Sequence, residues 1–305
     1  MLAPRPLPEI DWNTIIPPYD DHPFFRDCEK APFRPKAVVF DMVNAWWLCE
    51  AATLAYSEPE LAKARFAAAG LADVDFFSGP STQCYLAAGT SFAILAFRGT
   101  ETGKRQNRDD YANIVADIRA DFDIRLKQSG QGGKVHRGFL EALDEVWAPL
   151  VRKLEEVAAR GLKLWMCGHS LGAALATLAA DRFGNVSGLY TFGSPRVGDE
   201  SFKRDFFIPT YRFVNNNDIV TQVPPPPYRH VGQLRYIDHQ GLVHDDSDRW
   251  HRWIDSIQGH FQTAFNAVGK LRKGFKVLVP DGLKDHAPTL YATCIWNNLV
   301  RTMAS

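Results

Sequence analysis

A serine lies in the pentapeptide GHSLG at residues 168–172, between the apolar run LKLWMC and the small-residue run AALATLAA. A strand that turns sharply into a helix would present the Ser170 hydroxyl above the sheet edge, where a hydrolase nucleophile acts. The first helical turn directs N–H groups at that site, so the N–H of Leu171 is a candidate oxyanion donor. The pattern favours a nucleophile over an ordinary helix cap. Cys167, inside the apolar strand, is the less suitable rival.

A serine nucleophile needs a base and a carboxylate that orients the base. After a strand–serine–helix turn, the acid precedes the base in the chain. Asp218 directly follows an expected strand at residues 211–214, so its side chain can reach the same sheet edge, whereas Asp238 and Asp245 are less well anchored. The histidines that follow Asp218 are the candidate bases: His230, His239, His244, His251, His260 and His286.

Local sequence separates several of the nine histidines. His286 follows the strand-like run FKVLVP and a polar turn, which suits a base at a sheet edge. His260 lies beside Ile257 and Phe261 in an expected helix, so we expect it to pack against apolar side chains. We expect His230 to support the segment after Asp218. We interpret His136 and His169 as structural, and HDDSD at 244–248 as the solvated entry to a helix rather than a cation site, because no metal-ligand spacing repeats there.

Several segments resemble the class 3 lipases, the fungal-lipase-like branch of the α/β-hydrolases. Besides GHSLG, the matching segments are FRGT (97–100), KVHRGF (134–139), TFGSPRVGD (191–199), YRFVNNNDIVTQVPP (211–225) and DHAPTLY (285–291). The last resembles the DHSPxxY of bacterial members, and the resemblance spans about residues 40–300. It implies an α/β-hydrolase fold, with a mostly parallel central sheet and helices on both faces.

The resemblance also implies residue roles and an activity. It makes Ser170, Asp218 and His286 the catalytic triad, and Thr100 the second oxyanion residue beside Leu171. The implied reaction is hydrolysis of triacylglycerol or simpler acyl esters without a metal or cofactor. A phospholipase A1 or a feruloyl-type esterase is the alternative. A binding protein on an inactive hydrolase scaffold is less favoured, because such a protein would have no chemical reason to keep all these residues.

Two departures from the family pattern stand out. Ala173 follows Gly172 where the family most often has a second glycine, and the loop after FRGT is polar, unlike the amphipathic lid of strict lipases.

The chain around these motifs alternates between expected strands and helices. Apolar runs predict strands at residues 83–88, 92–97, 162–167, 189–192 and 211–214. Apolar periodicity predicts helices at residues 41–56, 138–154 and 171–182, the first with one apolar face. Strands that alternate with helices indicate a parallel sheet with helical crossovers.

Proline content and charge divide the chain further. Eight of the 19 prolines fall within residues 1–35, which predicts an extended arm at 1–36 around a single domain at 37–305. The polar run ETGKRQNRDD predicts a lid at 101–112. A helical insertion at 248–273 is a second candidate cover, with Trp250 and Trp253 against the acyl chain. Packing of this helix on the core is the favoured alternative.

Composition excludes other classes of protein. The 305 residues are 46% hydrophobic, and 35 basic side chains balance 35 acidic ones, so we expect neither a disordered chain nor a nucleic-acid partner. We expect no transmembrane segment, only transient contact with a lipid interface. Five scattered cysteines without CxxC argue against a zinc site. The N-terminal residues do not form a signal peptide, so we expect a cytoplasmic protein, or a secreted one if a signal has been removed.

Overall fold

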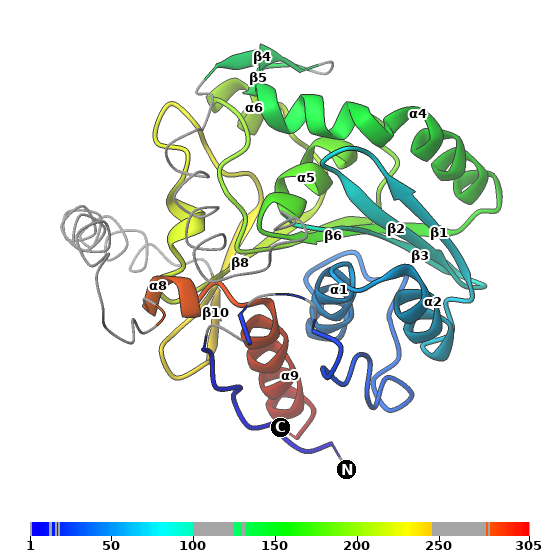
Figure 1. Cartoon of the computed structure of the whole chain (residues 1–305), viewed down its shortest axis with the longest axis vertical. Helices are drawn as coiled ribbons and strands as arrows, with labels where there is room; N and C mark the ends of the chain where they lie inside the picture. The colour runs from blue at the N-terminus through cyan, green and yellow to red at the C-terminus, as the bar shows by residue number, and fades with distance from the viewer. Residues whose placement is uncertain are drawn as a thin grey trace.

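The structure is a computed structural model that describes residues 2–11, 14, 15, 17, 19–99, 125–129, 132–245, 279 and 281–304. Within these residues, eight strands form a central sheet in the order β1-β2-β3-β6-β7-β8-β9-β10 (Figure 1). Their bounds are β1 Asp73–Ser78, β2 Gln83–Ala88, β3 Phe92–Phe97, β6 Lys163–His169, β7 Gly188–Phe192, β8 Thr210–Asn215, β9 Gln233–Ile237 and β10 Val243–Asp245. The strands from β3 to β9 run parallel, whereas the pairs β1–β2, β2–β3 and β9–β10 are antiparallel. The predicted mostly parallel sheet is confirmed.

Helices cover both faces of this sheet (Figure 1). The long helices are α1 Met42–Leu54, α2 Pro59–Ala68, α4 Arg137–Ala159, α5 Leu171–Phe183 and α9 Pro288–Ala304. The shorter elements are α6 Glu200–Asp205, α8 Asp281–Lys284, the 3-10 turn η1 Ile219–Gln222, and the strand pair β4 Leu126–Gln128 with β5 Lys134–His136. Helices α4 and α5 lie on one face, and α1, α2 and α9 on the other.

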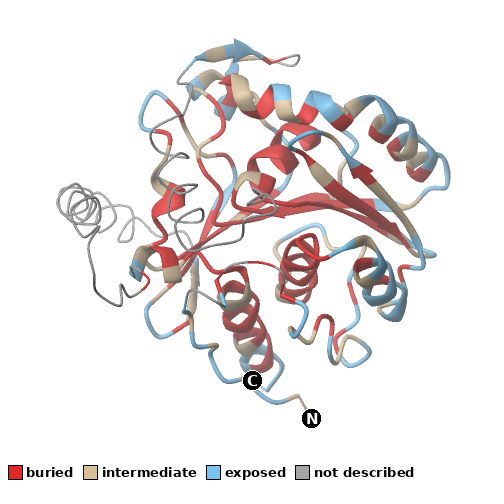
Figure 2. Cartoon of the chain, viewed as in Figure 1, coloured by how far each residue is buried: buried red, intermediate tan, exposed pale blue. Residues whose placement is uncertain are grey.

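The strand side chains alternate between the two faces, as strand geometry requires. Leu95 and Met166 pack with α4 and α5, whereas Ile94 and Trp165 pack with α1 and α9. Figure 2 shows the result as buried strands between helices whose outer faces are exposed. Burial on both faces explains why the central strands read as continuous apolar runs.

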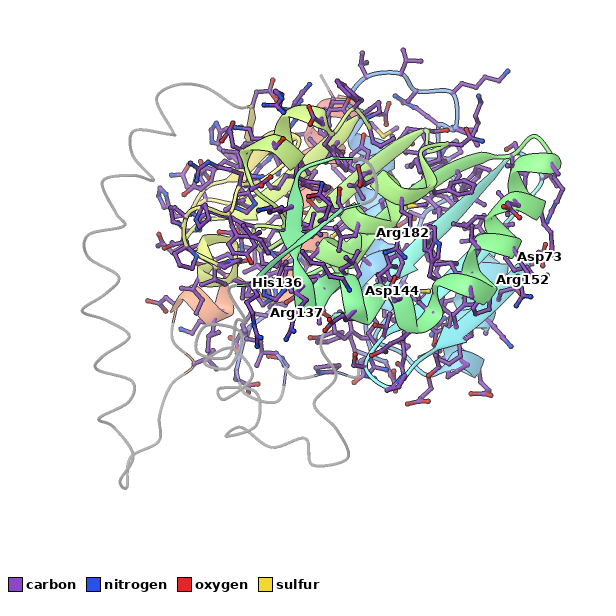
Figure 3. The ribbon with its side chains drawn as sticks, turned by 90° about the horizontal axis from the view of Figure 1, so that it is seen from above. Asp73, His136, Arg137, Asp144, Arg152 and Arg182 are labelled. Carbon is purple, nitrogen blue, oxygen red and sulfur yellow. The ribbon has the colours of Figure 1, made fainter. Side chains whose placement is uncertain are left out.

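Helices α4 and α5 are also joined at their exposed sides. Asp144 of α4 accepts a hydrogen bond from Arg182 of α5, with 2.7 Å between Oδ1 and Nη1 (Figure 3).

Helix α1 differs from its prediction in how much of it is buried. The sequence predicts one apolar face, yet every residue from 43 to 54 is buried. The remaining side is covered by α9 and by the N-terminal segment, whose Phe25 and Phe33 pack against Trp47 at ring-centroid distances of 5.2 Å and 5.8 Å. A helix that is enclosed by other elements can be apolar on every side.

The N-terminal segment is held by one buried carboxylate. Glu50 of α1 accepts hydrogen bonds from Trp46 Nε1 at 2.9 Å and Arg5 Nη1 at 3.3 Å, and its Oε2 lies 3.0 Å from His22 Nε2. The Arg5 guanidinium carbon lies 4.1 Å from the ring centroid of Trp296 in α9. The described part of residues 2–36 therefore contacts both α1 and α9, while the predicted division into an arm at 1–36 and a domain at 37–305 stays a prediction.

The predicted lid at 101–112 and the insertion at 248–273 lie outside the described residues. Among the helices that are described, none combines the length and the apolar character needed to cross a bilayer.

Candidate active site

Ser170 stands at a strained turn between β6 and α5. Its backbone has φ 57° and ψ −131°, and φ is rarely positive for a residue with a side chain. Its hydroxyl makes no capping bond to α5, so Ser170 does not serve as an ordinary helix cap. Backbone strain of this kind costs about 1–3 kcal/mol and gathers at functional sites.

Two glycines allow the turn to close. A Cβ at Gly168 would lie 2.3 Å from the carbonyl carbon of Gly172, and a Cβ at Gly172 would lie 2.4 Å from the carbonyl oxygen of Phe97. The second contact shows that the end of β3 lies directly against the start of α5. The backbone that precedes Thr100 therefore borders the serine turn, although Thr100 itself lies outside the described residues.

Leu171 is the first residue of α5. The first N–H groups of a helix have no partner within the helix, and the helix dipole favours negative charge at that end. An oxygen that becomes negative near Ser170 would therefore meet a favourable field.

Asp218 and His286 form a buried pair, 68 residues apart in the chain. The His286 Nδ1 lies 3.0 Å from Asp218 Oδ1 and 2.9 Å from Oδ2, and the two residues are only 2% and 1% exposed. Because a carboxylate only accepts hydrogen bonds, Nδ1 carries the proton and Nε2 carries the lone pair. The arrangement is that of a base oriented by an acid.

The loop that carries the acid is held from two sides. We call residues 215–218 the acid loop. The hydroxyl of Tyr291, in α9, donates to Asp218 Oδ2 at 2.7 Å and accepts from the backbone N–H of Asn215 at 2.8 Å. On the other side, the N–H of Val220 donates to Asp218 Oδ1 at 3.0 Å. The carboxylate is thus fixed by more bonds than the one to His286.

The serine turn and the buried pair meet at the carboxyl edge of the sheet. The N–H of Ser170 donates to the carbonyl oxygen of Phe192, the last residue of β7, at 3.0 Å. A Cβ on the next residue, Gly193, would lie 2.7 Å from Asp218 Oδ2 and 2.9 Å from His286 Nδ1. The three sequence-predicted residues Ser170, Asp218 and His286 therefore surround the end of β7.

His169 links the serine turn to His286 directly. Its Nε2 lies 2.7 Å from the carbonyl oxygen of His286, and its Nδ1 lies 2.9 Å from the hydroxyl of Tyr56. A carbonyl only accepts, so Nε2 donates and Nδ1 accepts from Tyr56. Burial, together with the nearby His286, holds the pKa of His169 well below its ordinary value. A neutral ring thus positions His286, which is a more specific role than the sequence predicts for His169.

The competing candidates have other partners. Asp238 accepts from the N–H groups of Gln240 and Leu242 and lies 2.8 Å from His244 Nε2, so it stabilises a turn. Asp245 has a side chain that is 82% exposed. Cys167 is fully buried, and this burial raises the pKa of its thiol well above the ordinary value, which disfavours the nucleophilic thiolate.

The other candidate histidines either have different partners or lie outside the described residues. His230 donates from Nε2 to the carbonyl oxygen of Thr221 in η1 at 2.8 Å, and so supports the segment after Asp218, as the sequence predicts. His136 accepts from the N–H of Phe139 at 3.3 Å and caps α4, at whose start it is labelled in Figure 3. His251, His260 and the two tryptophans at 250 and 253 lie outside the described residues. In the described part of the chain, no group of three or more ionisable side chains is arranged to hold a metal ion.

Sequence reasoning assigned no role to Tyr56, Tyr291 or Asp285. Tyr291 and Asp285 end and begin the segment DHAPTLY, so the motif itself was the available signal. No local pattern signals Tyr56, because its partner His169 lies 113 residues away.

Comparison with known proteins gives a consistent group of relatives. Residues 94–228 match the family model described as lipase (class 3). The chain is 32% identical over 171 residues to the secreted mono- and diacylglycerol lipase 1 of Fusarium solani, a match that covers 49% of each protein. It is 31% identical over 149 residues to the chloroplastic phospholipase A(1) DAD1 of Arabidopsis thaliana, covering 43% of this chain and 33% of that protein.

A solved structure supports the fold. The triacylglyceride lipase of Rhizomucor miehei superposes with a TM-score of 0.50 at 26% identity, covering 65% of this chain and 80% of that one. The matches to the Fusarium and Arabidopsis proteins span half or less of those relatives. The residues that match the family model include Ser170 and Asp218 but not His286.

Proposed function

Because residues 94–228 of the chain belong to the class 3 lipase family, we propose that the protein is a serine hydrolase of carboxylic esters. Its proposed substrates are acylglycerols or simpler acyl esters. The observation that carries the proposal is the buried bond of 2.9 Å between His286 and Asp218, beside a serine held at φ 57°. An oriented base beside a strained serine is the arrangement that nucleophilic catalysis needs.

In the first half of the proposed reaction, the lone pair of His286 Nε2 takes the Ser170 proton while Ser170 Oγ attacks the ester carbonyl carbon. The carbonyl oxygen becomes negative and accepts a hydrogen bond from the backbone N–H of Leu171. Thr100 supplies the second donor by family resemblance. Each such donor contributes about 2.7–4 kcal/mol of transition-state stabilisation.

Collapse of the tetrahedral intermediate expels the alcohol, which takes the proton from Nε2 and leaves an acyl group on Ser170. Water then repeats the attack with His286 as base, and the carboxylic acid leaves. In each step the Asp218 carboxylate stabilises the imidazolium that forms transiently.

A phospholipase A1 activity is the second candidate, because a relative with that name is 31% identical to this chain. The two candidates differ in the headgroup that the site must accept, so substrate competition separates them. We would compare p-nitrophenyl esters of increasing acyl length, a triacylglycerol emulsion, phosphatidylcholine and a feruloyl ester. The preferred ester defines the substrate class.

The mechanism itself is tested by a serine-reactive phosphonate. We expect the reagent to label Ser170 alone and Ser170→Ala to lose hydrolysis of every ester. Labelling of another residue, with an active Ser170→Ala variant, would exclude the mechanism.

Contact with a lipid surface and the two covers at 101–112 and 248–273 also remain proposals. A polar cover exposes little apolar area when it moves, so activity on a short-chain ester should rise smoothly through the solubility limit of that ester. A sharp rise at emulsion formation would instead support the tryptophan-containing insertion. Trp253→Ala then distinguishes a pocket, whose preferred acyl length shifts, from a core helix, whose thermal stability falls.

A further inference from the structure

A second carboxylate, Asp285, lies directly before the base in the chain and faces the acid loop. Its Oδ2 accepts hydrogen bonds from the backbone N–H of Asn217 at 3.0 Å and from the side-chain amide of Asn216 at 3.1 Å. Its backbone carbonyl accepts from the side-chain amide of Asn215 at 2.9 Å. One residue therefore bonds three successive residues of the acid loop.

We propose that Asp285 is a positioning residue that clips the acid loop to His286 and so fixes the distance between acid and base. This inference rests on the proposed function in assigning those two roles. Asp285 does not touch the substrate in this proposal. It acts through Asp218, which the acid loop carries, and through His286, the next residue in the chain.

The acid loop needs such a clip because its backbone is unusual. Asn216 has φ 41°, a conformation that costs free energy in a residue with a side chain. Its side-chain amide and the N–H of Asn217 both point to the same oxygen of Asp285. Loss of that oxygen would release two donors and allow the turn to relax, and Asp218 is the next residue along.

Helix α8 brings Asp285 to this position. A Cβ at Gly282 would lie 2.5 Å from Cγ2 of Ile219 and 2.9 Å from the carbonyl oxygen of Asn217, so α8 packs directly on the acid loop and η1. The N–H of Asp285 donates to the carbonyl oxygen of Asp281 at 2.9 Å, which continues the helical turn to residue 285. The clip therefore has a rigid base rather than a free loop end.

The charge of Asp285 adds a pH dependence to this geometry. Burial, together with the neighbouring Asp218 carboxylate, raises the pKa of the Asp285 carboxyl to about 6, although the bond from Asn217 lowers it. Among the described residues, the titratable and charged groups around it are Asp218, Tyr236, Asp281, Lys284, His286, Tyr291 and Cys294.

The sign of the effect follows from this pKa. Above about pH 6 the ionised carboxylate accepts charge-assisted bonds, and it adds negative charge beside the imidazolium that forms during the reaction. Below that pH both effects weaken as the carboxyl gains a proton. We therefore expect the acid limb of the kcat/KM profile to fall more steeply than a single protonation requires.

The kinetic test compares Asp285→Ala, Asp285→Asn and the control Asp281→Asn, with a soluble p-nitrophenyl ester as substrate. Asp281 belongs to the same short helix but has a side chain that is 87% exposed. We expect Asp285→Ala to lower kcat by about 100-fold with KM within about threefold, because small displacements of catalytic groups have effects of that size. Asp285→Asn keeps an acceptor oxygen, so kcat should recover to within about fivefold of wild type, with a one-proton acid limb. Asp281→Asn should match wild type in both respects.

A readout that is independent of turnover separates this inference from the proposed function. The proton on His286 Nδ1 gives a far-downfield NMR signal when it is bonded to Asp218, and His286→Gln identifies that signal by its loss. We expect the signal to disappear in Asp285→Ala and to persist in Asp285→Asn and Asp281→Asn. If wild type hydrolyses no ester while this NMR pattern holds, the proposed function fails and the clip stands.

The clip is overturned if Asp285→Ala keeps both the signal and wild-type turnover, or if Asp285→Asn is as impaired as Asp285→Ala. If Asp285→Ala does not fold, Asp285→Asn decides the question. A one-proton acid limb in that variant supports the clip, and a limb as steep as that of wild type refutes it.

Discussion

Replacing Tyr291 by phenylalanine removes one hydroxyl that bonds two groups of the acid loop. The hydroxyl donates to Asp218 Oδ2 at 2.7 Å and accepts from the N–H of Asn215 at 2.8 Å. Tyr291, Asp218 and Asn215 are 0%, 1% and 3% exposed, so water cannot easily replace the lost oxygen. The ring of Tyr291 would stay packed between its neighbours, and the change is confined to the two hydrogen bonds.

The two bonds set the size of the effect. A hydrogen bond to a charged group contributes about 1.5–3 kcal/mol, and a buried N–H left without an acceptor costs about 1–3 kcal/mol. These contributions overlap, so we expect Tyr291→Phe to lower the free energy of unfolding by about 3 kcal/mol. Asp218 keeps its bonds to His286 and Val220, so we expect kcat to fall only about tenfold, or about 1.4 kcal/mol in activation free energy.

Tyr85→Phe is the matched control. Tyr85 is as deeply buried, but its hydroxyl donates only to the neutral carbonyl oxygen of Ser57, at 2.8 Å. We expect a loss of about 1 kcal/mol in unfolding free energy and no loss of kcat. Urea titration followed by tryptophan fluorescence gives the first quantity, and initial rates on a soluble ester give the second. Equal stability and equal activity of the two variants would refute this role of the Tyr291 hydroxyl.

Three further perturbations test other parts of the site and the fold. Ser170→Ala and His286→Ala should each lower the rate of ester hydrolysis by about six orders of magnitude. His260→Ala should keep a rate within a few-fold of wild type. A larger loss of rate in His260→Ala than in His286→Ala would show that His260 is the base. Gly193→Ala should lower kcat by at least about 100-fold, because the new Cβ would lie 2.7 Å from Asp218 Oδ2 and the backbone there has φ 58°. Gly184→Ala is the control, because Gly184 has φ 76° but open space around it, so this variant should lose only stability. Equal activities of the two variants would exclude the close contact. Burial alone would raise the pKa of Glu50, yet His22, Arg5 and Trp46 hold it below its ordinary value. The stability from this group is therefore complete above the unfolded carboxyl pKa of about 4.3 and is lost as the pH falls through the lower folded pKa. Glu50→Gln should cost about 3 kcal/mol of unfolding free energy near neutral pH, and urea titrations should show the difference from wild type shrinking in acid; a difference independent of pH would contradict the assignment.

The sequence predicts those strands that are continuous apolar runs bounded by turn residues. Strands β2 and β3 begin and end where predicted, because each is an apolar run bounded by turn residues. Strands β1, β9 and β10 were not predicted. Only one of the six residues of β1 is buried, so its sequence DVDFFS has no clear period. Arg235 interrupts the apolar run of β9, and β10 has three residues and no buried one.

In the candidate site, too, some residues could be predicted from the sequence and others could not. Gly168 could be interpreted locally, because a Cβ there would meet Gly172 within the same turn, whereas the close contact that requires Gly172 is with Phe97 of β3. The bonds from Tyr56 to His169, from Tyr291 to Asp218 and from Asp285 to the acid loop join residues 68 to 113 positions apart. Periodicity in one segment carries no information about a partner so distant, and only the folded arrangement brings these side chains together.

The contact between the N-terminal segment and α9 has a consequence for how the chain is made. The carbonyl oxygen of Ala3 accepts from Trp296 Nε1 at 2.9 Å, and the N–H of Arg5 donates to Asn297 across 292 positions of sequence. During synthesis on the ribosome, α1 emerges long before α9 does, so the side of Trp46 that packs against Trp296, at a ring-centroid distance of 4.8 Å, stays uncovered until then. Helix α1 is enclosed on that side only after residue 297 has left the exit tunnel. Chaperones that bind nascent apolar segments would therefore find α1 accessible for most of translation.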